Sequence, residues 1–261
     1  MKLTLPSEPD KPQLYAHMSQ LEDLACAYRI LAEHGVIDAY GHVSVRSERD
    51  PNRYLLSRSL APERVTEEDI IEYDLDSRAL DGNGRESVRE RFIHGEIYKT
   101  RPEVMAVVHN HSPSVVPFSI TDVSMKAVFH MAAFVGSGLP NFEIRDAQPG
   151  TDLLVKTPYL GQALARTLGG KPAALMRGHG AVVVGENLPR AVGRSIYLEM
   201  SARMQMQAMM IAGPGGKITF MDESEVAASV PPQEYNRAWP LWRARALVQI
   251  EAEKKNAAQG R

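Results

Sequence analysis

The segment ERFIHGEIYKTRPEVMAVVHNHSPSV, residues 90–115, joins a helical pattern to a strand pattern that ends in two histidines. The spacing of apolar residues predicts a helix over 86–99, stopped by the Arg101-Pro102 pair. The following run VMAVVHNH is short and apolar, which is typical of a buried strand. Residues i and i+2 of a strand point to the same face, so His109 and His111 are expected to project together, where they could bind one cation. The alternative is an ordinary strand-to-loop transition with two polar residues.

Helix and strand patterns also alternate on both sides of this segment. Upstream, a helix is predicted over 18–35, and HVSVR (42–46) and RYLLS (53–57) have the pattern of strands. Downstream, AALMRGHGAVVVGE predicts two strands around a glycine-flanked turn, and residues 189–213 predict a long helix. No break in composition separates these elements, which favours one α/β domain over residues 1–261. Their interleaving alone leaves the strand directions of the sheet open.

The composition is that of a globular chain with no marked charge. Of its 261 residues 44% are hydrophobic and 24% are charged, and the formal net charge is −2. No strong basic field is available to bind nucleic acid or an anionic membrane. No apolar run approaches the ~18 residues of a membrane span, and the first residues lack the pattern of a signal peptide. We therefore expect a cytoplasmic protein that binds neither nucleic acid nor membranes.

The single cysteine and the eight histidines restrict any transition-metal site to imidazole and carboxylate ligands. Cys26 alone excludes an intrachain disulfide and any site built from several thiolates. It lies in a helical apolar pattern, which favours a buried and unreactive thiol. The histidines are His17, His34, His42, His94, His109, His111, His130 and His179.

Two further positions could join the pair His109 and His111 in a metal site. His179 lies in RGHG between two apolar strands, where the flanking glycines allow close approach of the backbone to a bound group. Alone it would be a polar residue in a hairpin turn, but three imidazoles are the usual protein ligands of an open catalytic metal site. Glu90 precedes His94 by one turn of the predicted helix, so the two would share a face. Glu90 is then an acid/base group or a further ligand, or else part of a solvated charged surface.

The order of these motifs resembles that of the class II aldolase/adducin family. The matching segments follow each other from about residue 25 to 205 and are LAEHGVIDAYGHVSVR, LLSRSLAPERVTEEDIIEYDLD, ERFIHGEIYKTRPEVMAVVHNHSPSV and LMRGHGAVVVGENLPRAV. The resemblance implies a three-layer α/β/α fold with a central mixed, largely antiparallel sheet flanked by helices. It also implies a core over about 20–210 and a C-terminal helical extension over about 230–256.

The resemblance implies roles for individual residues as well. The family's metal ligands correspond to His109, His111 and His179, and its catalytic glutamate corresponds to Glu90. The tyrosine with which a neighbouring subunit donates a proton in the aldolases aligns with His130, and an imidazole is also a common proton donor. The family resemblance further implies a homotetramer with the sites at the subunit interfaces.

Three departures from the sugar-phosphate aldolases coincide at the residues that bind phosphate. The Gly-Asn pair of those enzymes is Gly-His at 41–42, their TPSG loop is SRSL at 57–60, and their Ser-Ser pair before the glutamate is Val-Arg at 88–89. These substitutions are similar to the decarboxylase-type branch of the family, in which one member acts on a hydroxy-methylpyridine dicarboxylate and uses manganese. A phosphorylated sugar is therefore not the expected substrate.

We expect instead a divalent-metal-dependent lyase that decarboxylates a hydroxylated aromatic or heteroaromatic (di)carboxylate through a metal-stabilised enolate. A guanidinium matches a carboxylate bidentately, so Arg58 and Arg89 are expected to bind the substrate. Ser57 and His42 are further candidates for substrate binding, and the alternative for His42 is a capping or core role.

The proton for the ring carbon would come from Glu90 or His130, and nitrogen and oxygen ligands leave manganese, zinc, iron and cobalt open. Three alternatives remain: a class II aldolase cleaving a hydroxy-keto acid or ketose, a non-haem metal oxygenase acting on an aromatic acid, and an adducin-like scaffold without activity.

Overall fold

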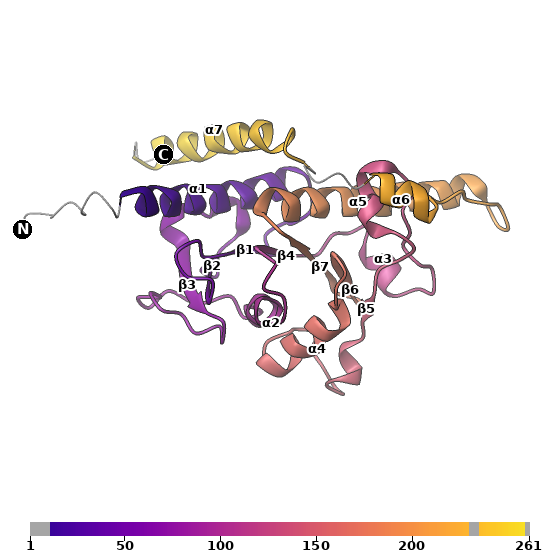
Figure 1. Cartoon of the computed structure of the whole chain (residues 1–261), viewed down its shortest axis with the longest axis horizontal. Helices are drawn as coiled ribbons and strands as arrows, with labels where there is room; N and C mark the ends of the chain where they lie inside the picture. Colours follow the sequence, from indigo (N-terminus) through magenta and orange to yellow (C-terminus); the bar gives the residue numbers. More distant parts are fainter. Residues whose placement is uncertain (1–10, 230–234, 259–261) are drawn as a thin grey trace, which may run out of the picture.

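The structure is a computed structural model that describes residues 11–229 and 235–258, and it has three layers (Figure 1). A seven-stranded sheet forms the middle layer. Its strands are β1 (His42–Arg46), β2 (Arg53–Ser57), β3 (Ile70–Asp74), β4 (Ala106–Asn110), β5 (Asn141–Phe142), β6 (Ala173–Met176) and β7 (Gly180–Gly185). They lie in the order β3-β2-β1-β4-β7-β6-β5, and every neighbouring pair is antiparallel except β5 and β6. The prediction of a mixed, largely antiparallel sheet flanked by helices is confirmed.

Helices cover both faces of the sheet, which separates two hydrophobic cores. The α-helices are α1 (Lys11–Glu33), α2 (Phe92–Thr100), α3 (Val116–Ser119), α4 (Pro158–Leu168), α5 (Leu188–Ala212), α6 (Glu223–Ser229) and α7 (Trp239–Ala258). The 3-10 helices are η2 (Pro62–Arg64), η3 (Glu67–Asp69), η4 (His130–Val135) and η5 (Ile144–Asp146). Figure 1 shows α1 and α5 on one face with α7 outside α1, and α2 and α4 on the other face.

Strand β1 shows how the alternation of the sequence positions the site. Val43 and Val45 point into the core under α1 and α5. His42, Ser44 and Arg46 alternate with them and so face α2 on the other side, where all three are buried. A strand with polar residues on a buried face requires hydrogen-bond partners for each of them, and α2 provides these partners.

The helix predicted over 86–99 begins later than the periodicity indicates. Its first residue is Phe92, because Ser87 pairs with Arg58 in an isolated β-bridge and residues 89–91 form a turn. Glu90 therefore does not lie on a regular helix with His94, and the prediction that the two share a helical face is wrong. The backbone carbonyl of Glu90 accepts a hydrogen bond from the N–H of Ile93 at the start of the helix.

The remaining sequence predictions concern the ends of the chain, Cys26 and membrane spans. Most of the predicted C-terminal extension, about 230–256, is helix α7, while residues 230–234 lie outside the described residues. Cys26 is buried in α1 as expected, and burial raises the pKa of its thiol to about 12. Among the described helices, none is long and apolar enough to cross a bilayer.

Candidate active site

Four side chains that are distant in the sequence meet at one end of the sheet. Glu90, His109, His111 and His179 each offer one ligand atom, and these atoms all lie within 4.8 Å of one another. The Nε2 atom of His111 is 3.2 Å from Nε2 of His109 and 3.1 Å from Nε2 of His179. Oε2 of Glu90 lies 3.6 Å from Nε2 of both His109 and His179. Three imidazole nitrogens and one carboxylate oxygen therefore converge on a single point.

Two of the three rings have their other nitrogen bound to a backbone carbonyl. Nδ1 of His109 lies 3.2 Å from the carbonyl oxygen of Ala181, and Nδ1 of His179 lies 2.9 Å from that of Leu153. A carbonyl only accepts, so each Nδ1 carries the proton and each Nε2 keeps its lone pair toward the cluster. Leu153 has φ of 70°, an uncommon conformation for a residue with a side chain, and its carbonyl is the one that orients His179.

The pairing of β4 with β7 brings the turn that carries His179 against His109 of β4 and His111, which follows the strand. In this pairing His109 lies opposite Val182 and Asn110 lies opposite Ala181. Close approach at this point depends on Gly180, because a Cβ there would lie 1.9 Å from the carbonyl oxygen of Asn110. Gly180, the first residue of β7, is thus required for the cluster to form.

We expect Gly180→Ala to lower the free energy of unfolding by about 1–3 kcal/mol and to weaken metal binding, because the added methyl group pushes β7 away from β4. Gly170→Ala is the matched control, since a Cβ at Gly170 meets nothing within 4 Å. Denaturant unfolding and metal titration measure the two effects. A Gly180→Ala chain with wild-type stability and metal affinity would show that the close contact does not matter.

Glu90 is held in place by one oxygen and presents the other to the histidines. Its side chain is buried, with the residue 7% exposed, and Oε1 accepts a hydrogen bond of 2.8 Å from the N–H of Val155. Burial raises the pKa of Glu90, while His179 and the Val155 N–H act in the opposite direction. A carboxyl group in such surroundings binds a proton more readily than one in water.

The residues of the cluster fit a divalent cation. Burial lowers the pKa of His109 well below its ordinary value, assisted by the neighbouring rings of His179 and His42, and burial also lowers the pKa of His111. Neutral imidazoles with convergent lone pairs and a nearby carboxylate are the donor set of an open catalytic site for zinc, manganese or iron. Converging lone pairs repel each other, and a bound cation is the simplest group that relieves this repulsion.

A cavity of about 390 Å³ adjoins the cluster and is large enough for a small aromatic acid. It contains Glu90 and His111 from the cluster, His42 from β1, and Arg89 from the turn before α2. Its remaining lining residues are Tyr40, Gly41, Ser59, Glu86, Val88 and Leu154. A cation site, a guanidinium and an imidazole thus face one volume, which suits an anionic ligand.

Three of the predicted site residues lie outside this cavity. Arg58 donates from Nε to Oδ1 of Asp69 at 2.7 Å, and Ser57 donates its hydroxyl hydrogen to the Tyr28 hydroxyl on the other face of the sheet. His130 is exposed at the start of η4, which packs against α5 and α6. Within one chain the structure therefore brings together Glu90, the three histidines, His42 and Arg89, and leaves these three apart.

Sequence reasoning missed the groups that orient the cluster. Two are backbone atoms, the carbonyl of Leu153 and the N–H of Val155, and no side-chain pattern indicates them. His94, outside the cluster, forms a 2.7 Å hydrogen bond with His42 of the adjoining cavity, and burial lowers its pKa to about 3. The position of His94 opposite β1 depends on how α2 packs against the strand, and no local pattern in the sequence indicates this packing.

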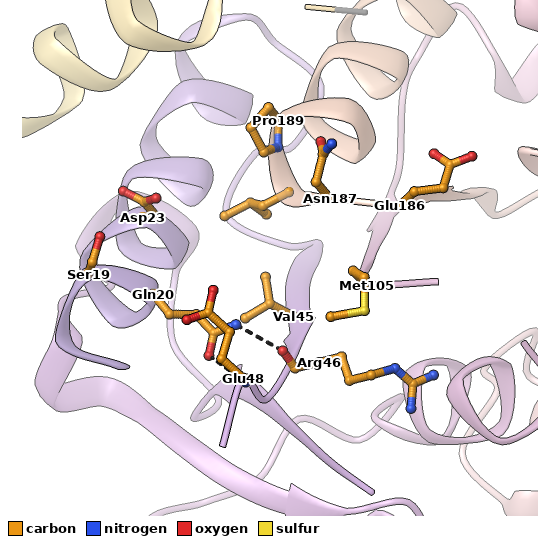
Figure 2. Close-up of a pocket in the computed structure, with 11 residues that line it drawn as sticks. Ser19, Gln20, Asp23, Val45, Arg46, Glu48, Met105, Glu186, Asn187 and Pro189 are labelled. Atoms are coloured by element: carbon orange, nitrogen blue, oxygen red, sulfur yellow. Dashed lines mark hydrogen bonds between the residues drawn. The ribbon is translucent and has the colours of Figure 1, made fainter. Parts of the chain in front are cut away.

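A second cavity, of about 410 Å³, lies at the opposite end of β1 and β4 (Figure 2). Figure 2 shows Asp23, Glu48 and Glu186 around it, and Asp23 is already paired with Arg243. The guanidinium of Arg46 donates instead to backbone carbonyls, among them that of Tyr98. Glu186 is likewise paired, with Arg190 and Arg194. The cluster of metal-ligating side chains lies instead beside the other cavity, which is therefore the candidate for the chemistry.

The comparison with known proteins agrees with this geometry. The model of the class II aldolase and adducin N-terminal domain matches residues 22–206, which include every residue of the cluster. The chain belongs to the class II aldolase/adducin family. The resemblance found in the sequence motifs is thereby confirmed.

Curated relatives of this class II aldolase/adducin chain include decarboxylases. The chain is 34% identical over 235 residues to the decarboxylase tropJ of Talaromyces stipitatus, covering 82% of this chain and 88% of that protein. It is 28% identical over 221 residues to the 3,4-dihydroxyphthalate decarboxylase of Arthrobacter keyseri, covering 81% and 86%. Among solved structures, the L-fuculose 1-phosphate aldolase of Glaciozyma antarctica shares the fold, with a TM-score of 0.73, 22% identity and coverage of 98% and 96%.

Proposed function

We propose that this class II aldolase/adducin chain is a divalent-metal-dependent lyase that decarboxylates a hydroxylated aromatic or heteroaromatic (di)carboxylate. The observation that carries the proposal is the convergence of three imidazole nitrogens and the Glu90 carboxylate beside a cavity that also contains Arg89. The similarity to the decarboxylase tropJ supports the reaction, and the similarity to a 3,4-dihydroxyphthalate decarboxylase supports this substrate class.

The residues of the chain divide the work of such a reaction. His109, His111 and His179 would hold the cation, and the chemistry it supplies when bound is Lewis acidity toward oxygen atoms of the substrate. Arg89 binds and orients a carboxylate in the cavity. When the bond between the ring carbon and the carboxylate breaks, CO2 leaves and the electron pair of that bond stays with the ring. The ring carbon then accepts a proton. Glu90, fixed through its Oε1, holds that proton at Oε2.

A second candidate for the proton donor is His130. It is exposed and lies outside the cavity of its own subunit. We propose that the chain forms a homotetramer in which His130 reaches the cavity of a neighbouring subunit. Light scattering tests the assembly: a monomer that retains full turnover at micromolar concentration would contradict it.

Product analysis separates decarboxylation from the other reactions that such a site could perform. The manganese-loaded chain is incubated with hydroxylated phthalates and hydroxypyridine carboxylates, while CO2, aldehydes and dissolved oxygen are measured together. We expect one CO2 per substrate consumed, with no aldehyde and no oxygen uptake. Aldehyde without CO2 would indicate an aldolase, and oxygen uptake in proportion to turnover would indicate an oxygenase; either result overturns the proposal.

Arg89→Ala is expected to raise KM for the carboxylate substrate about tenfold while kcat changes little, because a hydrogen bond to a charged group is lost. Arg58→Ala serves as the comparison, since Arg58 is paired with Asp69 outside the cavity, and its KM is expected to stay within about twofold of the wild-type value. Steady-state kinetics of both variants decides which arginine binds the substrate. A KM that rises in Arg58→Ala alone would assign the contact to Arg58.

A further inference from the structure

A buried series of hydrogen bonds runs from the interior to the cavity. The hydroxyl of Tyr98 lies 2.8 Å from Oγ of Ser44, and Oγ of Ser44 lies 2.6 Å from Nδ1 of His94. Nε2 of His94 lies 2.7 Å from Nδ1 of His42. All four side chains are buried, and only His42 among them lines the cavity.

The series follows from the packing of one strand against one helix. His42 and Ser44 are two residues apart on β1 and face α2, while His94 and Tyr98 are four residues apart on α2 and face β1. The four side chains therefore interleave along the line of contact between the two elements. A polar seam at this place is costly unless every hydrogen on it has an acceptor.

Only one direction of donation along the series gives every hydrogen an acceptor. The Tyr98 oxygen also has a hydrogen bond with the backbone of Val107, which favours the phenolate and therefore comes from the N–H. Among the described residues this leaves Oγ of Ser44 as the acceptor for the hydroxyl hydrogen, so Tyr98 donates to Ser44. Ser44 then donates to Nδ1 of His94, which leaves the proton of that ring on Nε2, from where it is donated to Nδ1 of His42. In the reverse direction the buried Tyr98 hydroxyl would have no acceptor. His42 is therefore left with its proton on Nε2.

The Nε2 atom of His42 reaches the cavity beside the metal cluster. His42 lines this cavity together with Glu90 and His111, and its ring centroid lies 4.9 Å from that of His109. The pairing of β1 with β4 sets this position, since His42 lies opposite His109. No described residue forms a hydrogen bond with Nε2 of His42, and this nitrogen is not enclosed by protein atoms. An N–H donor thus faces the place where a substrate would lie.

We propose that Tyr98, Ser44 and His94 fix the tautomer of His42, so that its Nε2–H points into the cavity and donates a hydrogen bond to a carboxylate oxygen of the substrate. The identity of the acceptor as a substrate carboxylate rests on the proposed function, whereas the tautomer rests on the hydrogen bonds alone. His42 contacts the substrate, and the other three are positioning residues that act through it.

Neutron diffraction from crystals of the perdeuterated chain tests the tautomer, because it locates deuterium on each ring nitrogen directly. We expect deuterium on Nε2 of both His42 and His94. In Ser44→Ala the donor to Nδ1 of His94 is gone, and deuterium is expected to be shared between the two nitrogens of His42. Ser195→Ala, which also removes a buried hydroxyl with one hydrogen bond, is the control and should leave His42 unchanged. Deuterium on Nδ1 of His42 in the wild-type chain, or a single Nε2 position in Ser44→Ala, overturns the inference.

Binding of phthalate, a dicarboxylate without hydroxyl groups, tests the contact with the substrate. In His42→Gln the amide nitrogen takes the place of Nε2, and in His42→Asn it takes the place of Nδ1. Calorimetric titration of the zinc-loaded chain is expected to give a Kd within about threefold of the wild-type value for His42→Gln and at least about tenfold weaker for His42→Asn. Equal affinities in both variants and the wild-type chain would overturn the contact.

The two tests distinguish this inference from the proposed function. If phthalate binds as expected and the tautomers are as expected, the inference stands even where no CO2 is released from any hydroxylated acid. In that case the proposed decarboxylation fails alone. If CO2 is released but Nδ1 of His42 carries the deuterium, the inference fails and the proposed function stands.

Discussion

His179→Ala is expected to abolish stoichiometric metal binding and to reduce turnover at least ~10³-fold, the equivalent of about 4 kcal/mol of activation free energy. The physical reason is that one of three convergent nitrogens is lost, and the Nε2 atoms of His109 and His111 cannot hold an open catalytic site alone. His179 lies in a turn between two strands, so truncation of its ring leaves the sheet pairing intact. Metal content is measured by plasma mass spectrometry after dialysis, and turnover by CO2 release.

His34→Ala provides the matched control for the removal of an imidazole. His34 follows α1 and packs edge-on against Trp242 of α7, and it belongs neither to the cluster nor to the cavity. We expect this variant to retain the metal ion and most of the turnover. If His179→Ala keeps one divalent ion per chain and turns over within threefold of the wild-type rate, the metal site is assigned to the wrong residues.

Glu90→Gln is expected to lower kcat by about 10²–10⁴-fold while the metal content stays unchanged. Glutamine has the shape of glutamate and its amide oxygen still accepts the hydrogen bond from the N–H of Val155, so the turn before α2 keeps its geometry. What it lacks is a site that binds and releases a proton beside the histidines. Single-turnover kinetics on the metal-loaded variant separates this loss from any effect on product release.

Glu96→Gln controls for the loss of a buried carboxylate near the site. Glu96 lies on α2 with 2% exposure and pairs with Lys99, but it does not line the cavity. We expect its turnover to remain close to that of the wild-type chain. His130→Asn is the companion variant for the second proton source, and full turnover in both Glu90→Gln and His130→Asn would contradict the acid/base assignment even if the metal site stands.

Local patterns in the sequence predicted the strands that carry the site. HVSVR and RYLLS match β1 and β2 residue for residue, because polar and apolar side chains alternate or cluster where a strand has two different surroundings. The spacing of His109 and His111 and the glycines around His179 indicated a cation site, and the ligand atoms of these residues lie within 4.8 Å of one another and of Glu90. These features are local, and each can be seen within a few residues.

Interactions between distant segments explain what the sequence did not indicate. The helix predicted over 86–99 begins six residues later, at Phe92, because Ser87 forms a bridge with Arg58, which lies on a different segment. Arg58 and Arg89 looked equivalent as carboxylate ligands until Asp69, placed by the pairing of β2 with β3, bound Arg58. The bond between His42 and His94 likewise joins residues 52 positions apart and depends on how α2 packs on β1.

Anomalous X-ray diffraction from crystals of the manganese-loaded chain tests the central claim most directly. One strong anomalous peak per chain is predicted, bound by the Nε2 atoms of His109, His111 and His179, and absent from crystals of His179→Ala. A manganese-loaded crystal with no peak at these three nitrogens, or with its manganese bound elsewhere, would contradict the account.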